Sequence, residues 1–358
     1  MSLPQKRVTL KMIADRAGCS VAVVSTVLNA AKGRTIVRQA LRDKVQAIAR
    51  ELDYAPNFAS RCLKANRSRT LGIYDSPKQW HSYSNAYEMT LLSGIERAVF
   101  ERNYDLLLLN FHQNNLPEIC ENRLKDRRID GILLLQCNAR QKWIRDLLKI
   151  SPNLMAIGFN EEYPDLNRVA FDNRKAVRLA VRKLLESGHR RIAFVGSCIE
   201  HPEHDAQIRE QTFLEIIREL NLQDSFLFNR KNCPNGISER EPYCQREGQE
   251  AIRWLAMLPE KPDAILCYNA LVGGSLYYEA LRMGCRIPED FSLVVIDKPG
   301  LEDLGGPQIA YIDHPLEEMG YTGASRLIDQ LESEREFEPF FQLFSPVFIE
   351  KETFCRRI

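Results

Sequence analysis

Several polar side chains stand at the ends of short apolar runs, in a pattern suited to holding a small hydroxylated molecule. Asp75 and Asp297 end the runs LGIYD and FSLVVID, and Asn269 follows the run DAILCY. Asparagine both donates and accepts hydrogen bonds and a carboxylate accepts them, so together they can satisfy hydroxyl groups. The guanidinium of Arg209 can span two neighbouring oxygens. An aromatic face such as that of Tyr243 can cover the C–H groups of a sugar ring.

These side chains converge only if the apolar runs are strands of parallel sheets. Such runs alternate with amphipathic stretches of helical periodicity, which predicts βαβ units, and nearly 290 residues predict two α/β lobes. The carboxyl ends of parallel strands meet at one edge, where such sheets bind ligands. The expected strands span 71–75, 104–111, 130–136, 153–159, 190–197, 263–268 and 291–297, and the helices between them include 87–103, 174–188, 208–220, 245–258 and 272–284.

The first 69 residues differ in charge from the remainder of the chain. They carry 14 lysines and arginines against four acidic residues, whereas the other 289 residues carry 35 against 44. A basic segment joined to an acidic body is typical of a nucleic-acid-binding module attached to another function. With 44% hydrophobic and 27% charged residues, the 358-residue chain is not a disordered one.

The basic segment has the signals of a three-helix unit. Thr9 can cap a helix that Gly18 ends, and Ser20 can cap a second helix that runs to Leu28. A third helix is expected over about 36–52, so the segment is predicted to be a helix-turn-helix domain. Its second helix fits the major groove of DNA. The basic side chains that can neutralise phosphates are Lys6, Arg7, Lys11, Lys32, Arg34, Arg38 and Arg42.

A short segment after the third helix is expected to fold only against a partner. Residues 57–63 could make two turns of helix, which is too short to be stable alone. If the partner is DNA, Leu63 can wedge between base steps in the minor groove.

The stretches VTLKMIADRAGCSVAVVSTVLN and LDYAPNFASRCLK resemble the head of the lactose-repressor (LacI/GalR) family. The resemblance implies that Val21, Ala22 and Thr26 help to read bases, that Ser25 and Asn29 contact the DNA backbone, and that Leu63 is the minor-groove lever. The DNA-binding positions expected from the pattern and the resemblance are Thr9, Ser20, Val21, Ala22, Ser25, Thr26, Asn29, Lys32, Arg34, Asn57, Ser60 and Leu63.

The recognition helix also departs from the family pattern. Thr26 stands where the family usually has arginine, so the commonest reader of guanine is missing and the preferred operator should differ from the typical one. Val21 and Ala22 can offer only apolar contact, for example to a thymine methyl group.

The fragments ESGHRRIAFVGS, RIPEDFSLVVID and SPVFIEKETF are similar to the periplasmic-binding-protein-like core of the same family. The implied fold class is α/β: an all-α helix-turn-helix domain followed by a two-lobed parallel-sheet core. The expected domains are 1–53, a hinge segment 54–70, and a core 71–358, with lobe 1 at about 71–171 and 314–337, and lobe 2 at about 172–312 and 339–358. The chain should cross between the lobes near Asp172, near His314 and near Pro339.

The resemblance places the effector between the lobes. The expected effector-binding residues, from strand ends and family positions together, are Asp75, Tyr83, Phe159, Asn160, Arg209, Tyr243, Asn269 and Asp297. Ala270, Lys298 and His314 depart from the family pattern, and one missing carboxylate and one new cation alter the charge of the site. The ligand is therefore either a sugar or an anion such as an acidic sugar, and a core that no longer binds a sugar stays an alternative.

The expected function is that of a DNA-binding transcriptional regulator, a repressor whose affinity for a palindromic operator is modulated by a small ligand. It is expected to act as a homodimer, in the bacterial cytoplasm at the nucleoid. The alternatives are an enzyme on the same scaffold and a regulator controlled by a protein partner. The sequence lacks HExxH, GxSxG, GxxxxGK[ST] and GxGxxG, which favours a protein that is no enzyme and needs no cofactor. His201–Asp205 could hold a metal, but a polar loop explains the same residues.

Membrane insertion and a disulfide framework are not expected. No apolar run approaches the length of a membrane span, and the first residues have no apolar signal core. The ten cysteines form no CxxC pair and several lie in apolar runs, which predicts reduced, mostly buried thiols.

Overall fold

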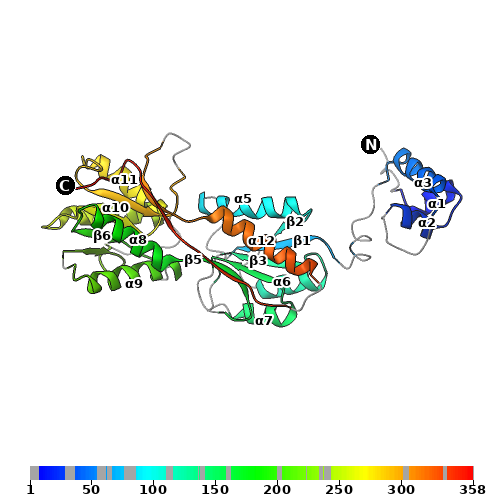
Figure 1. Cartoon of the computed structure of the whole chain (residues 1–358), viewed down its shortest axis with the longest axis horizontal. Helices are drawn as coiled ribbons and strands as arrows, with labels where there is room; N and C mark the ends of the chain where they lie inside the picture. Colours follow the sequence, from blue (N-terminus) through cyan, green and yellow to red (C-terminus); the bar gives the residue numbers. More distant parts are fainter. Residues whose placement is uncertain are drawn as a thin grey trace. The chain divides into compact units, whose positions relative to one another are not determined.

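The computed structural model describes residues 8–28, 37–54, 62, 67–75, 86–109, 116–135, 137, 142–158, 163–199, 204–222, 224–233, 237, 243–300, 306–333 and 337–357 (Figure 1). The chain divides into two compact units, residues 1–69 and residues 70–358, which we call the head and the core. The division falls within the predicted hinge segment 54–70, and the limits of that hinge stay a prediction.

The head contains three packed helices: α1 (Leu10–Ala17), α2 (Val21–Leu28) and α3 (Gln39–Glu51). Its apolar cluster is separate from those of the core and includes Ile13, Val24 and Val45, which are fully buried. The structure matches the predicted limits of the first two helices. The third begins at Gln39 rather than near residue 36.

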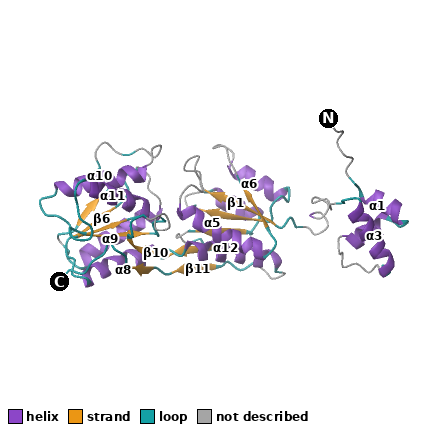
Figure 2. Cartoon of the chain, turned by 90° about the horizontal axis from the view of Figure 1, so that it is seen from above, coloured by secondary structure: helices purple, strands orange, loops and turns teal. Residues whose placement is uncertain are grey.

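The first sheet of the core is parallel throughout, in the order β11-β5-β4-β3-β1-β2 (Figures 1 and 2). Its strands are β1 (Thr70–Asp75), β2 (Asp105–Leu108), β3 (Gly131–Leu135), β4 (Leu154–Ile157), β5 (Asn167–Phe171) and β11 (Phe341–Phe344). Its helices are α5 (Ala86–Glu101), α6 (Leu116–Lys125), α7 (Trp143–Ile150) and α12 (Leu316–Glu332).

Alternate residues of this sheet face opposite layers of helices, as the pleat of a strand requires. In β3, Leu133 and Leu135 join the apolar cluster of α5 and α12, whereas Ile132 and Leu134 join the cluster of α6 and α7. Helices α5 and α12 approach so closely that a Cβ atom on Gly94 would lie 1.9 Å from a backbone oxygen of α12. Both faces of the sheet are therefore covered, which explains the continuous apolar runs.

The second sheet has the order β12-β10-β9-β8-β6-β7, with β12 antiparallel and the other strands parallel. Its strands are β6 (Ile192–Val195), β7 (Phe226–Phe228), β8 (Ala264–Cys267), β9 (Ser292–Ile296), β10 (Ala310–Asp313) and β12 (Val347–Ile349). Its helices are α8 (Asn173–Glu186), α9 (His204–Glu219), α10 (Tyr243–Met257) and α11 (Ala270–Arg282). All seven predicted strand ranges contain a strand, and the predicted two-lobed α/β fold class is confirmed.

One predicted lobe boundary is wrong. The chain crosses between the sheets after Phe171 and again at His314, near the expected positions. The third crossing was expected near Pro339, but β11 (Phe341–Phe344) pairs in parallel with β5 and so belongs to the first lobe. The crossing therefore lies between β11 and β12. Pairing decides the boundary, because the free edge of β5 offers β11 a full ladder of hydrogen bonds.

All ten cysteines are free, and five of them are buried. Burial raises the pKa of the Cys120 thiol to about 12, so this thiol is inert at neutral pH. In the part of the chain that the structure describes, no helix has the length and apolar character needed to cross a membrane.

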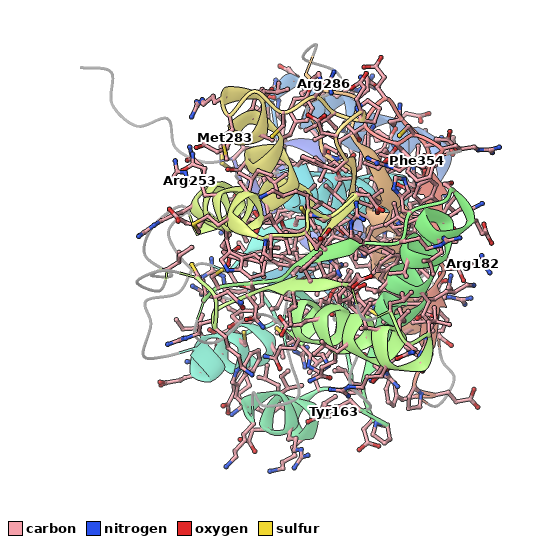
Figure 3. The ribbon with its side chains drawn as sticks, turned by 90° about the vertical axis from the view of Figure 1, so that its left-hand side faces the viewer. Tyr163, Arg182, Arg253, Met283, Arg286 and Phe354 are labelled. Carbon is pink, nitrogen blue, oxygen red and sulfur yellow. The ribbon has the colours of Figure 1, made fainter. Side chains whose placement is uncertain are left out.

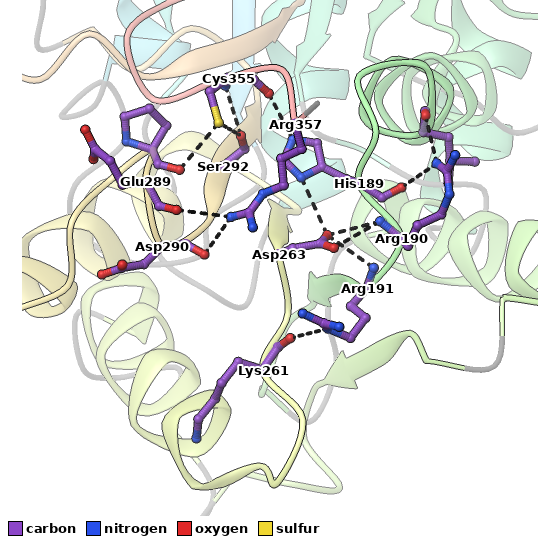
Figure 4. A network of polar contacts seen from close by, with 12 residues as sticks. His189, Arg190, Arg191, Lys261, Asp263, Glu289, Asp290, Ser292, Cys355 and Arg357 are labelled. Carbon is purple, nitrogen blue, oxygen red and sulfur yellow. Dashed lines mark hydrogen bonds and ion pairs between the residues drawn. The ribbon is translucent and has the colours of Figure 1, made fainter.

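A polar network ties the end of the chain to the second lobe (Figure 4). Asp263 accepts hydrogen bonds from the backbone N–H groups of Arg190 and Arg191 at 3.1–3.2 Å. His189 lies with one ring nitrogen 3.5 Å from Asp263 and the other 3.0 Å from the carbonyl oxygen of Cys355. Burial acts to raise the pKa of Asp263, but the contacts from His189 and the two N–H groups outweigh it, so the pKa is lowered.

This lowered pKa predicts an acid-dependent contribution to stability. A carboxyl group with a lowered pKa in the folded state stabilises the fold above its ordinary pKa of 3.8, and the contribution disappears as the pH falls through the folded-state value. We expect Asp263→Asn to lower the free energy of unfolding by about 1.5–3 kcal/mol at pH 7, because charge-assisted hydrogen bonds are lost. The deficit should shrink near pH 3. Urea unfolding at both pH values measures it, and a deficit independent of pH would contradict the prediction.

Candidate functional site

The turn between the first two helices of the head is built by local capping. The Thr9 side chain accepts a hydrogen bond from the Met12 N–H at 3.4 Å, and the Ser20 hydroxyl accepts one from the Val23 N–H at 3.3 Å. Gly18 adopts the left-handed conformation with φ of 72°, and its N–H bonds back to α1. The predicted caps and the glycine turn are confirmed, and Thr9 and Ser20 have structural tasks in them.

Helix α2 buries one face and leaves the other open at its N-terminal end. Val24 and Val27 are buried in the head, whereas Val21 and Ala22 are exposed. Ser25 and Thr26 are partly exposed, and the Thr26 hydroxyl donates to the Ala22 carbonyl oxygen at 2.9 Å. The open face is thus presented by the first turn of a helix, where side chains of a recognition helix reach base edges. Six predicted DNA-binding positions lie outside the described residues: Asn29, Lys32, Arg34, Asn57, Ser60 and Leu63.

Among the predicted effector-binding residues, the structure brings Arg209 and Asp297 together. The Nη1 atom of Arg209 lies 3.3 Å from Oδ2 of Asp297, although the two residues are 88 positions apart. Arg209 comes from α9, and Asp297 follows β9 directly. Tyr83, Phe159 and Asn160 lie outside the described residues, and only the backbone of Asp75 and Tyr243 is described.

Arg209 is the centre of a buried hydrogen-bond network. Its Nε atom donates to Oδ1 of Asn173 at 2.6 Å, and its Nη1 atom donates to the carbonyl oxygen of Tyr268 at 2.6 Å. Nδ1 of His314 lies 2.8 Å from Oδ1 of Asp297. Arg209 is only 4% exposed and Asp297 only 7%. The network therefore joins residues that follow three neighbouring strands, β8, β9 and β10, at their carboxyl ends.

The electrostatics of the network keep both partners charged. Burial acts to raise the pKa of Asp297, but Arg209 and then His314 outweigh it, so the pKa is lowered. Burial acts to lower the pKa of Arg209, and Asp297 above all reverses this effect. Asp297 also has a φ of 77°, in the left-handed region that residues other than glycine seldom adopt. Such strained backbone is concentrated at functional sites.

Asn269 is not part of this network. Its side-chain oxygen accepts a hydrogen bond from the Val272 N–H at 2.8 Å and so caps α11, and its Nδ2 atom lies 3.7 Å from Sγ of Cys244. The side-chain oxygen of Asn269, which was predicted to bind a ligand, is therefore already engaged as the cap of α11. Tyr268, next to it, donates from its hydroxyl to the buried carboxylate of Glu247 at 2.9 Å.

Sequence reasoning did not predict Asn173 or Phe171 as site residues, and it named His314 only as a departure from the family pattern. The His314 ring stacks on the Phe171 ring with 3.9 Å between centroids and an interplanar angle of 15°. The sequence did offer a signal for Phe171 and His314, because both lie at predicted crossings between the lobes. Segments that cross between lobes pass beside a site placed there, so their side chains are candidates for it.

A metal site receives no support from the described residues. No three of their histidine, cysteine, aspartate or glutamate side chains are grouped so as to hold a metal ion. Three of the five residues of the sequence candidate His201–Asp205 lie outside the described part.

Comparison with known proteins identifies both units. A family model described as "Bacterial regulatory proteins, lacI family" matches residues 9–57, and a model of a periplasmic binding protein-like domain matches residues 181–354. The ribose operon repressor of Escherichia coli (strain K12) is 27% identical over 335 residues, which cover 90% of this chain and 93% of that protein. The transcriptional repressor PurR of Erwinia tasmaniensis is 25% identical over 347 residues, 96% of each chain.

Solved structures have the same fold. The lac repressor dimer bound to operator and the anti-inducer ONPF is 19% identical, with a TM-score of 0.76, over 97% of this chain and 99% of that one. The transcriptional regulator CelR in complex with cellobiose is 23% identical, with a TM-score of 0.65, over 97% of this chain and 100% of that one. The chain thus combines a helix-turn-helix domain of the lacI family of bacterial regulatory proteins with a periplasmic-binding-protein-like domain.

Proposed function

We propose that this chain is a sequence-specific DNA-binding transcriptional regulator, a repressor whose affinity for its operator is modulated by a sugar or sugar derivative held between the two lobes of the core. The observation that carries the proposal is the open N-terminal face of α2 in a head with a large excess of basic residues. The relatives named above are repressors, which supports the same direction of control.

The proposed ligand site lies around the buried network of Arg209 and Asp297. Arg209 and Asp297 supply donors and an acceptor at the carboxyl ends of strands, where α/β sheets hold ligands. The complex of CelR with cellobiose supports a carbohydrate as the class of ligand. Ligand binding would bias the two lobes toward one arrangement, and the hinge segment 54–70 would fold on operator DNA in only one of the two states.

A homodimer is proposed because one short recognition helix reads too few bases alone, and a two-fold dimer reads a palindrome. Large apolar side chains of α11 and of the ends of α10 and α11 are 42–73% exposed; these are Met257, Leu271, Tyr278, Leu281 and Met283, of which Figure 3 labels Met283. Exposed large apolar side chains on two helices that pack together favour an interface there. The occupant that we propose is the same surface of a second copy of the chain.

We expect Leu281→Asp to convert the dimer into a monomer and to weaken operator binding at least tenfold, because the new carboxylate would be buried without a partner. Leu220→Asp is the matched control, since Leu220 is also an exposed leucine of the second lobe, 53% against 44%, but follows α9. Sedimentation velocity measures the assembly state. Dissociation by both variants, or by neither, would contradict the proposed surface.

The proposed function is tested by selecting bound duplexes from a random DNA pool with the full chain. We expect an enriched palindrome whose affinity falls by about 10³–10⁵-fold between 50 and 200 mM salt, the loss that six to ten neutralised phosphates produce. Fluorescence anisotropy measures the affinity. No enrichment, or an affinity indifferent to salt, would overturn the DNA-binding role. Enrichment with no response to sugars would point instead to control by a protein partner.

A further inference from the structure

One buried nitrogen of the network, Nε2 of His314, has no hydrogen-bond partner among the described residues. His314 stands between β10 and α12, and its side chain is fully buried. Phe171 covers one face of the ring, and Tyr87 approaches edge-on with 5.5 Å between centroids. Nδ1 faces Asp297, but no described residue offers a hydrogen-bond partner to Nε2. An unsatisfied buried polar atom destabilises a fold, so such an atom calls for an explanation.

The contact with Asp297 determines which ring nitrogen carries a proton. Asp297 is ionised beside Arg209, and a carboxylate can only accept hydrogen bonds, so Nδ1 of His314 must donate. In the neutral imidazole the proton then sits on Nδ1, and Nε2 presents a lone pair. Only a second proton, on Nε2, would turn this atom into a donor.

The charge balance around the ring opposes that second proton. The charged groups of the buried network are the guanidinium of Arg209 and the carboxylate of Asp297, which neutralise each other at 3.3 Å. The other titratable groups around the network are Tyr87 on α5, Asp313 beside the ring on β10, Lys298 beyond Asp297, and Asp205 on α9, which acts on Arg209. Lys298 is exposed, and Asp205 and Asp313 are only partly buried, so none of them compensates a buried charge as Asp297 does. An imidazolium would add a second buried cation to a network whose one fully buried anion, Asp297, is already paired with Arg209, which is costly.

We propose that Nε2 of His314 accepts a hydrogen bond from a hydroxyl or N–H group of the ligand, so that the site selects a ligand that is uncharged at this point. This inference rests on the proposed ligand-binding function. Of the two ligand classes that the sequence left open, it favours the neutral sugar over the acidic one, because an anionic oxygen at Nε2 would have to bring a proton with it.

The first test needs no ligand. In the full chain labelled with ¹⁵N-histidine, two-dimensional ¹H–¹⁵N spectra report the protonation of each ring nitrogen, and loss of one set of signals in His314→Gln assigns this residue. At pH 7.5 we expect a protonated Nδ1 and a bare Nε2. A protonated Nε2 in the unliganded chain would overturn the inference, whatever the ligand proves to be.

The second test uses calorimetry with matched probes, D-ribose against D-ribose 5-phosphate and cellobiose against cellobionate. We expect a neutral member to bind better than its anionic counterpart, with the same enthalpy in phosphate and Tris buffers because no proton is taken up. His314→Gln, whose side-chain amide oxygen can still accept, should retain affinity within about threefold, whereas His314→Leu should lose about 10–100-fold. Arg178→Gln, which changes an exposed arginine on α8, is the control and should leave the affinity unchanged.

The outcomes separate the inference from the function on which it rests. Preferred binding of the anionic member with uptake of about one proton, or unchanged affinity in His314→Leu, would overturn the inference and leave a ligand-binding regulator. Silence of all four probes would count against the proposed ligand class and the inference together. The ¹⁵N spectra then still decide whether Nε2 is bare.

Discussion

Replacing Arg209 with methionine is expected to lower the free energy of unfolding of the core by about 3–5 kcal/mol, the usual cost of leaving one member of a buried ion pair alone. The carboxylate of Asp297 would lose its guanidinium while still buried, and Asn173 and the Tyr268 carbonyl would lose a donor. Ligand binding should be lost as well, because the network that supports the site would be broken. Urea unfolding monitored by circular dichroism measures the loss of stability.

Two companion variants separate burial from charge. Arg178 is an arginine of the same lobe whose ion pair with Glu219 is solvent-exposed, so Arg178→Met should cost no more than about 1 kcal/mol. The double variant Arg209→Met with Asp297→Leu removes both charges and should recover part of the loss. If Arg209→Met were as stable as Arg178→Met, the network would not be the buried support that we describe.

Replacing Val24 with aspartate is expected to abolish operator binding, with a loss of at least about 10³-fold, to the level of non-specific binding. Val24 is fully buried in the small apolar cluster of the head, and a carboxylate there would have no partner. Because the core has its own apolar clusters, its unfolding transition should be unchanged. Fluorescence anisotropy with the selected operator measures the binding, and thermal unfolding measures the core.

The matched control places the same charge on the surface of the head. Met12 is 43% exposed on α1, so Met12→Asp should leave the head folded and cost less than about tenfold in operator affinity. Equal losses for the two variants would mean that charge alone explains the effect. Retained operator binding in Val24→Asp would remove the head from the proposed interface.

Short-range sequence signals were sufficient to predict the helix caps, the glycine turn and the most apolar strands. The caps at Thr9 and Ser20 and the turn at Gly18 were predictable because each acts within a few residues. The predicted strands were long apolar runs such as the one that ends at Asp297, and burial on both faces requires that composition. Strands β5, β7, β10, β11 and β12 were not predicted because they are short or mixed in composition, and each forms by pairing with the edge of a neighbouring strand.

The site divides in the same way. From residue types, strand ends and family motifs, the sequence alone determined that Arg209, Asn269 and Asp297 are candidates for binding polar groups, and that role stays a prediction. Only the tertiary structure decided that Arg209 and Asp297 neutralise each other, that Asn269 is engaged as a helix cap, and that His314 is buried with one nitrogen unpaired among the described residues. The reason is physical: charge balance and hydrogen-bond satisfaction depend on which distant groups are buried together, and chain order does not specify that.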